Sequence, residues 1–184
     1  MRVRTVLIAA GAVVLLPAVS SGQALSPATR GPVIAEFGPV FRIESPDFPT
    51  PRGQVLRAVF DVSESAAEPD QLNRRLESAA RFLNMHGQAG VPASDLRVAL
   101  VVHGTAGKDL LDHEGYRRRH GVDNPNRALI AALIEAGAEV VLCGQTQVSR
   151  GLDRSELASG VKVALSAMTA LVALQENGFR LVAM

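Results

Sequence analysis

The sequence has little cysteine and few aromatic residues. Of its 184 residues one is cysteine, Cys143, and phenylalanine, tyrosine and tryptophan together make up 4%. A single cysteine excludes a disulfide-stapled fold and any zinc or iron–sulfur site built from several cysteines. Apolar residues nonetheless make up 47% of the chain and charged residues 20%, with a formal net charge of +1. This composition is typical of one globular domain and excludes a disordered chain.

The chain also lacks an apolar run of the ~20 residues that a membrane-spanning helix needs. Its first 24 residues contain a run of 11, Val6–Leu16, which follows Arg2 and Arg4 and ends at Pro17. A basic start, a short apolar run and small residues after it form the pattern of a secretory signal peptide. We therefore expect residues 1–24 to direct export to the periplasm and to be removed. An uncleaved N-terminal anchor is the alternative.

An excess of charge of one sign is also missing. Without Arg2 and Arg4 the chain has 17 basic and 18 acidic residues, a net charge of −1. This balance predicts no nucleic-acid partner, and no membrane partner once the signal is cleaved.

Residues 25–53 are rich in proline, with six of the ten prolines of the chain between positions 26 and 53. Because proline lacks a backbone N–H donor and fixes φ, this stretch cannot be a helix or a central strand. A flexible linker would not carry the large apolar residues found here, which are Val33, Ile34, Phe37, Val40, Phe41, Ile43 and Phe48. We predict an extended arm that packs on the core or on a neighbouring subunit.

Residues 54–184 alternate strand patterns with helix patterns. Strands are predicted over 55–62, 96–102, 139–142, 161–165 and 179–182, and helices over 70–86, 124–136 and 167–177. A polar insertion is predicted over 105–123. The strands are almost continuously apolar, as in a parallel sheet covered on both faces. The predicted fold class is therefore α/β, a three-layer α/β/α sandwich.

Several short runs suggest a phosphate-binding loop or a metal site, but their spacing does not match the known patterns. The run from Gly104 to Lys108 has two residues between its glycines, whereas a phosphate-binding loop needs four, and neither GxGxxG nor GxSxG occurs. We interpret this run as a polar loop, and Ser166 and Thr169 as a cap of the last helix. One polar cluster matches no metal-binding spacing: Asp109, Asp112, His113, Glu114 and His120. We expect neither a metal nor a cofactor.

Cys143 is the most informative residue. It follows the predicted strand 139–142, and open parallel sheets bind their ligands at the carboxyl ends of the strands. A helical turn beginning after Gly144 would direct N–H groups at the sulfur and lower its pKa, and Arg150 and Arg154 would add positive potential. A lone cysteine in a sheet is also commonly a small buried apolar residue. Export favours a use for the thiol, because an unpaired thiol in an oxidising compartment is a liability unless it is buried or used.

The segment from Leu142 to Gly151 resembles the active-cysteine segment of the DsrE/DsrF-like family, which includes the TusD-type sulfur relay proteins. In those proteins six residues separate the cysteine from an Arg-Gly pair, and Cys143 and Arg150-Gly151 have this spacing. The run 161–166, the Pro-rich arm and the run 59–62 are similar to the exported branch of the family. The resemblance covers residues 32–184.

The resemblance implies a five-stranded parallel sheet of strand order 4-3-2-1-5 and assembly into trimers or hexamers. It also implies that Cys143 carries sulfur as a persulfide. In this hypothesis Arg150 stabilises the thiolate, Gly144 and Gln145 line the site, and His103 is a candidate for proton transfer. The sulfur donor and acceptor are not identified by the sequence.

Three functions remain open at this stage. A sulfurtransferase or sulfur relay protein requires an accessible Cys143 near positive groups. A non-catalytic exported binding or assembly protein on the same scaffold predicts a buried Cys143. A small-molecule sensor predicts a concave site built by two chains and the arm. The last predicted helix favours a homo-oligomer, because its apolar face is wider than one contact with a sheet requires; that face consists of Met168, Leu171, Val172 and Leu174.

Overall fold

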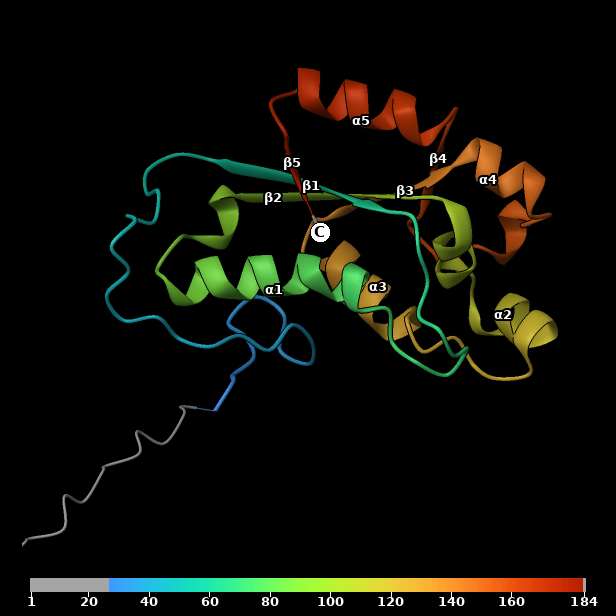
Figure 1. Ribbon diagram of the computed structural model, residues 1–184, viewed down its shortest axis with the longest axis horizontal. Coiled ribbons are helices and arrows are strands. Elements are labelled where there is room, and N and C mark those ends of the chain that lie inside the picture. Colours follow the sequence, from blue (N-terminus) through green and yellow to red (C-terminus); the bar gives the residue numbers. More distant parts are fainter. Residues whose placement is uncertain (1–26, 184) are drawn as a thin grey trace, which may run out of the picture.

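The computed structural model describes residues 27–183 and shows a five-stranded, all-parallel sheet (Figure 1). The predicted signal peptide lies outside the described residues. The strand order is β4-β3-β2-β1-β5, as the resemblance implies, so the predicted α/β fold is confirmed. The elements are β1 (Leu56–Val62), α1 (Arg74–Gln88), η1 (Ala93–Asp95), β2 (Leu96–Val102), η2 (Gly104–Leu110), α2 (His113–His120), α3 (Arg127–Glu135), β3 (Glu139–Cys143), α4 (Gly144–Ser149), η3 (Arg154–Glu156), β4 (Lys162–Ala164), α5 (Ala167–Glu176) and β5 (Arg180–Val182).

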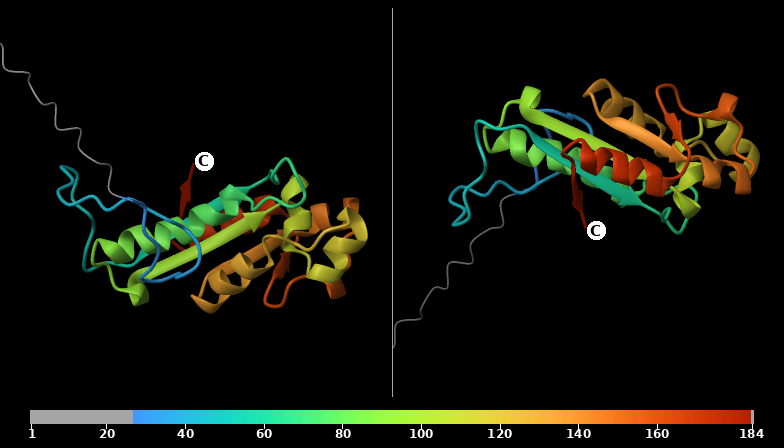
Figure 2. Two further views of the ribbon diagram at one scale, coloured as in Figure 1. Left: turned by 90° about the horizontal axis from the view of Figure 1, so that it is seen from below. Right: turned by 90° about the horizontal axis from the view of Figure 1, so that it is seen from above.

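Helices cover both faces of the sheet. The helices α1 and α3 lie on one face and α5 crosses the other, as the views from below and above show (Figure 2). Side chains alternate along each strand, so Phe60, Leu100 and Leu142 face α1 and α3, whereas Val59 and Val101 face α5. The larger part of the core lies on the α1 and α3 side. The almost continuously apolar strands are therefore explained by burial on both faces.

The stretch 105–123 is not the simple polar insertion that its composition predicts. It forms η2 and α2, and it buries Leu110, Leu111 and Tyr116, whose hydroxyl donates a hydrogen bond to the Pro69 carbonyl at 2.8 Å. The three consecutive arginines of α2 make this stretch look polar throughout, but they lie on the exposed side of the helix. Each is paired with a carboxylate group, from Glu114, Asp123 or Glu156.

The first part of the arm packs on α1 of the same chain. The buried Asn84 side chain accepts hydrogen bonds from the N–H groups of Val33 and Ile34 and donates to the carbonyls of Ile34, Phe37 and Gly38. A Cβ atom on Gly38 would lie 2.5 Å from the backbone of α1, so only glycine permits this approach. The side chain of Asn84 therefore supplies these backbone groups of the arm with the hydrogen-bond partners that a neighbouring strand would otherwise provide.

The second part of the arm lies outside this contact. Residues 41–49 are exposed, and Phe48 has an exposed fraction of 84%. Within this chain, therefore, the core buries apolar side chains of the arm only as far as Val40. Of the helices in residues 27–183, none is long and apolar enough to cross a membrane.

Candidate active site around Cys143

Cys143 is the last residue of β3, at the carboxyl edge of the sheet, and its side chain faces α5. It packs with Val101 and Val141 of the sheet and with Ala167 and Ala170 of α5. Its exposed fraction is 6%. The accessible cysteine that a sulfur carrier requires is therefore not found in the isolated chain. The cause is local: β3 directs this side chain to the face on which α5 begins.

The surroundings of the sulfur favour its ionised form. Burial by itself raises the pKa of the Cys143 thiol. The backbone amides of Thr146, Ala167 and Gln145, together with the Thr146 hydroxyl, outweigh that effect and lower the pKa below its ordinary value. The thiol occupies the N-cap position of α4 without a capping hydrogen bond of ordinary geometry, so the amides act as a group of N–H dipoles directed at the sulfur.

Thr146 links this group to the neighbouring strand. Its hydroxyl oxygen accepts a hydrogen bond at 3.1 Å from the N–H of Gly104, the second residue after β2. The hydroxyl proton is then available to Cys143. The sequence interpretation missed Thr146. The signal was present, because the third residue after a helix N-cap is the position whose N–H faces the capping side chain.

Ser166 explains why the backbone N–H of Ala167 is available to Cys143. As predicted, it caps the last helix: its Oγ atom accepts a hydrogen bond from the N–H of Thr169 at 3.0 Å. The N–H of Ala167, one residue after the cap, is thereby left for Cys143.

Gly144 and Gln145 lie beside Cys143 in the first turn of α4. A Cβ atom on Gly144 would lie 2.6 Å from the Ala164 carbonyl oxygen and 3.1 Å from that of Leu165. Glycine therefore allows α4 to lie against the end of β4. The exposed Gln145 donates a hydrogen bond through its Nε2 to the Leu165 carbonyl at 3.3 Å.

Arg150 and Arg154 lie farther from the sulfur. Arg150 is exposed at the far end of α4, roughly 10 Å along the helix axis from Cys143, and Arg154 is exposed in η3. The donors that lower the pKa of Cys143 are backbone amides and a hydroxyl group. An effect of Arg150 on the thiolate would act through this longer distance.

His103 directly follows β2, and its Nε2 atom lies 2.9 Å from Oδ1 of Asp61 in β1. Both side chains are partly exposed. Sequence reasoning identified His103 and missed Asp61, because the two residues are 42 positions apart and meet only when β1 pairs with β2.

The polar cluster considered for a metal is dispersed. Asp109 is fully buried and accepts hydrogen bonds from Ser65 and Asn73, while Asp112 caps α2 and Glu114 pairs with Arg118. Between residues 27 and 183, no group of three or more His, Cys, Asp or Glu side chains is placed to hold a metal ion. The run from Gly104 to Lys108, interpreted from the sequence as a polar loop, forms the first part of η2, in which Ala106 and Gly107 are buried.

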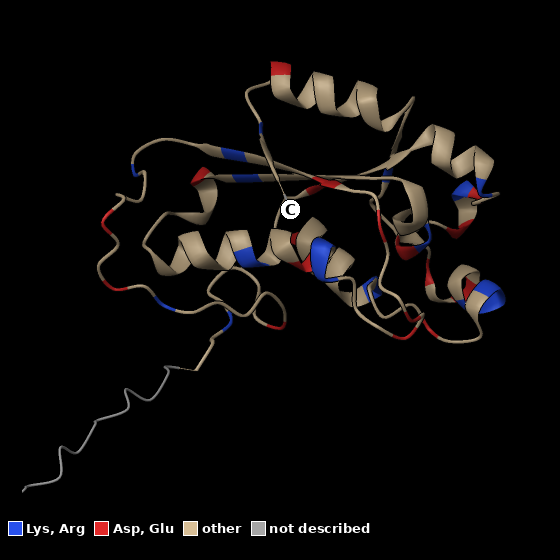
Figure 3. Ribbon diagram, in the orientation of Figure 1, with Lys and Arg blue, Asp and Glu red and all other residues tan. Residues whose placement is uncertain are grey.

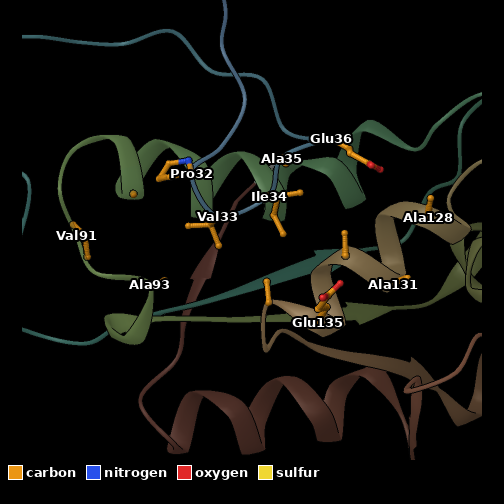
Figure 4. Close-up of a pocket in the computed structure, with 13 residues that line it drawn as sticks. Pro32, Val33, Ile34, Ala35, Glu36, Val91, Ala93, Ala128, Ala131 and Glu135 are labelled. Atoms are coloured by element: carbon orange, nitrogen blue, oxygen red, sulfur yellow. The ribbon is translucent and has the colours of Figure 1, made fainter.

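A separate cavity of about 790 Å³ lies between the arm and α3, away from Cys143. Val33 and Glu36 of the arm line one side, and Ala128, Ala131 and Glu135 of α3 line the other (Figure 4). Its residues come from the face of the sheet opposite to that of the cysteine.

Comparisons with known proteins found a matching family and similar solved structures. The model of the DsrE/DsrF-like family matches residues 57–184. MTH1491 from Methanobacterium thermoautotrophicum, described as a protein of unknown function, shares 21% sequence identity over 69% of this chain and 97% of its own, with a TM-score of 0.47. The ychN protein from E. coli shares 16% identity over 71% of this chain and 100% of its own, with a TM-score of 0.51. No curated protein matches the sequence.

The chain therefore belongs to the DsrE/DsrF-like family, because the family model covers more than half of it. Membership indicates a fold of the sulfur-relay type. The position and hydrogen-bonding environment of Cys143 then define the site whose chemistry is considered next.

Proposed function

We propose that the protein is a sulfurtransferase of the sulfur-relay type that carries sulfur as a persulfide on Cys143. One observation carries the proposal: Cys143 ends β3 at the carboxyl edge of the sheet, where nearby N–H and O–H groups lower the pKa of its thiol although it is buried. The thiolate is the reactive form of cysteine, so a buried thiol with a lowered pKa is suited to nucleophilic work. A cysteine that only fills space has no need of such donors.

The transfer proceeds in two displacements that balance without an oxidant. The Cys143 thiolate attacks the outer sulfur of a donor persulfide, R–S–SH; a new S–S bond forms to Cys143 and the donor's S–S bond breaks, releasing R–S⁻. An acceptor thiolate then attacks the outer sulfur of the Cys143 persulfide. This step forms the acceptor persulfide and restores the Cys143 thiolate. Gly144 and Gln145 line the site, and Arg150 contributes positive potential from the far end of α4.

Burial of the sulfur sets a condition on this mechanism. With 6% of Cys143 exposed, a donor reaches the sulfur only if the start of α4 or the segment joining β4 to α5 moves aside. The Gln145 contact with the Leu165 carbonyl joins these two segments, and it is an exposed hydrogen bond of 3.3 Å. Opening of this contact is the movement that we propose for uncovering the sulfur.

The proposal is tested by discharge of the carried sulfur. Protein first treated with a low-molecular-weight persulfide and then freed of it is mixed with a small thiol acceptor, and the acceptor persulfide is measured. Wild-type protein is expected to deliver up to one sulfur per chain, and Cys143→Ser none. Equal delivery by the two proteins would contradict the proposal.

A non-catalytic binding or assembly protein is the second candidate. The low exposure of Cys143 favours it, and so does the cavity between the arm and α3, whose volume lies in the range of small-molecule sites. This candidate predicts that Cys143→Ser leaves binding unchanged. The discharge experiment separates the two functions.

We further propose that the mature protein acts in the periplasm as a homo-oligomer, a trimer or a hexamer. The export proposal rests on the signal-like residues 1–24. The assembly proposal rests on α5, where Leu171 and Leu174 pack on the core while Met168 and Val172 are exposed, with Leu165 and Leu181 nearby in sequence exposed as well.

A further inference from the structure

Asp61 and His103 lie within hydrogen-bonding distance of one another beside the candidate site. The register of β1 and β2 places Asp61 opposite Val101, which faces α5. His103 lies two residues beyond Val101 in extended conformation, with φ −150° and ψ −170°, so its side chain emerges on the same face. The distance between Nε2 of His103 and Oδ1 of Asp61 is 2.9 Å.

The same register brings His103 next to Cys143. The last paired residues of β2 and β3 are Val102 and Leu142, so His103 and Cys143 occupy the next position on neighbouring strands. Neighbouring strands lie about 4.8 Å apart. Asp61, His103 and Cys143 therefore follow one another across the carboxyl edge of the sheet, on the face covered by α5.

The other charged residues on this face of the sheet lie away from Asp61, His103 and Cys143. At the amino ends of the strands the face carries Arg57, Arg97, Glu139 and Lys162, of which the last two are paired at 3.0 Å. Neither α4 nor the stretch of α5 from Ala167 to Gln175 contains a charged residue, and Glu176 lies at the far end of α5 (Figure 3). In η2, Lys108 and Asp109 are engaged with one another and with Tyr116, Ser65 and Asn73.

We propose that Asp61 is a positioning residue of sulfur transfer, acting on Cys143 through His103. This inference rests on the proposed function. The carboxylate of Asp61 accepts the Nε2–H of His103 and so holds the imidazole in one tautomer and orientation, which leaves Nδ1 unprotonated as a base. An aspartate that orients a histidine base beside a nucleophile is a recurring arrangement on unrelated folds.

The proton balance of the first displacement follows from this arrangement. His103 takes the proton of the Cys143 thiol, directly or through one water molecule, and the resulting imidazolium is stabilised by Asp61. The thiolate forms its bond to the outer sulfur of R–S–SH while the donor's S–S bond breaks. The departing R–S⁻ then takes the proton from His103. The net change converts Cys143–SH and R–S–SH into Cys143–S–SH and R–SH.

The experiment is rapid-quench mass spectrometry of Cys143 persulfide formation, from pH 5 to 9, with a low-molecular-weight persulfide as donor. Asp61→Asn and His103→Gln are expected to slow the reaction about tenfold or more near neutral pH and to change the shape of the pH profile in the same way. Asp61→Glu is expected to restore part of the rate. Asp47→Asn, an exposed carboxylate of the arm, is the matched control and is expected to behave as wild type.

Alkylation by iodoacetamide over the same pH range separates this inference from the proposed function. If wild-type protein forms no persulfide, the proposed function fails, and the inference is judged by alkylation alone. An alkylation profile that differs between Asp61→Asn and wild type, with equal thermal stability, then supports the coupling of Asp61 to Cys143. Wild-type rates and an unchanged profile in Asp61→Asn overturn the inference in either case.

Discussion

The Thr146 hydroxyl and the N–H of Gly104 are joined by a hydrogen bond of 3.1 Å, which ties the end of β2 to the first turn of α4. The same hydroxyl is among the donors that lower the pKa of Cys143. Thr146 therefore connects two segments of the site and contributes to the lowered pKa of its thiol.

Replacing Thr146 by valine is expected to raise the pKa of Cys143, because the shape of the side chain is kept while the hydroxyl is lost. The rate of alkylation by iodoacetamide near neutral pH should fall by about tenfold or more, since a hydrogen bond to a charged group contributes about 1.5–3 kcal/mol. Thr146→Ser keeps the hydroxyl and serves as the control. Identical pH profiles for Thr146→Val and wild type would show that the hydroxyl does not act on the sulfur.

Asn84→Ala is expected to release the arm and to lower the free energy of unfolding by about 3 kcal/mol or more. The truncation leaves several buried backbone groups of residues 33–38 without partners, and each such group costs about 1–3 kcal/mol. Urea denaturation measures the free energy, and limited proteolysis detects cleavage of the arm. Met85→Ala, the exposed neighbour on α1, should have little effect. Equal stability of the two variants would contradict the role of Asn84.

Asp109 is expected to make stability fall as the pH rises. Burial raises the pKa of the Asp109 carboxyl group above its ordinary value, although Ser65, Asn73 and Lys108 each oppose the shift. The folded state therefore binds the proton more tightly than the unfolded state, so the favourable contribution is complete below pH 3.8 and is lost as the pH rises through the raised pKa. Urea denaturation at several pH values should show this slope in wild type and its loss in Asp109→Asn. A slope that persists in the variant would assign it to other groups.

The proposed homo-oligomer is expected to depend on the exposed face of α5. Met168→Glu and Val172→Glu place charges where Met168 is 76% and Val172 61% exposed in a single chain. Burying such charges in an interface is costly, so both variants should sediment as monomers while wild type sediments as a trimer or hexamer. Ala173→Glu, another exposed position of α5, tests how far the interface extends. A wild-type protein that sediments as a monomer at micromolar concentration removes the assembly proposal.

The fold was largely predictable because its signals are local. The strand predicted over 96–102 coincides with β2, and the helix predicted over 167–177 agrees with α5 to within one residue. Both patterns depend on apolar residues at a regular period and on capping residues such as Ser166. The resemblance supplied the strand order, which local signals do not contain.

The candidate site was predictable only in part because its geometry is long-range. The position of Cys143 at a strand end followed from the sequence, but its burial depends on which face of β3 lies under α5. The contact between Asp61 and His103 depends on β1 lying next to β2. Thr146 is different, because its place three residues after Cys143 could have been read from the capping rule.

The measurement that tests the central claim most directly is intact mass spectrometry after incubation with a persulfide donor. Wild-type protein and Cys143→Ser are treated side by side, with a reductant control. The account predicts a mass gain of one sulfur in wild type, reversed by reductant and absent from the variant. No mass gain, together with a Cys143 that is inert to iodoacetamide, would contradict it and would assign the thiol to core packing.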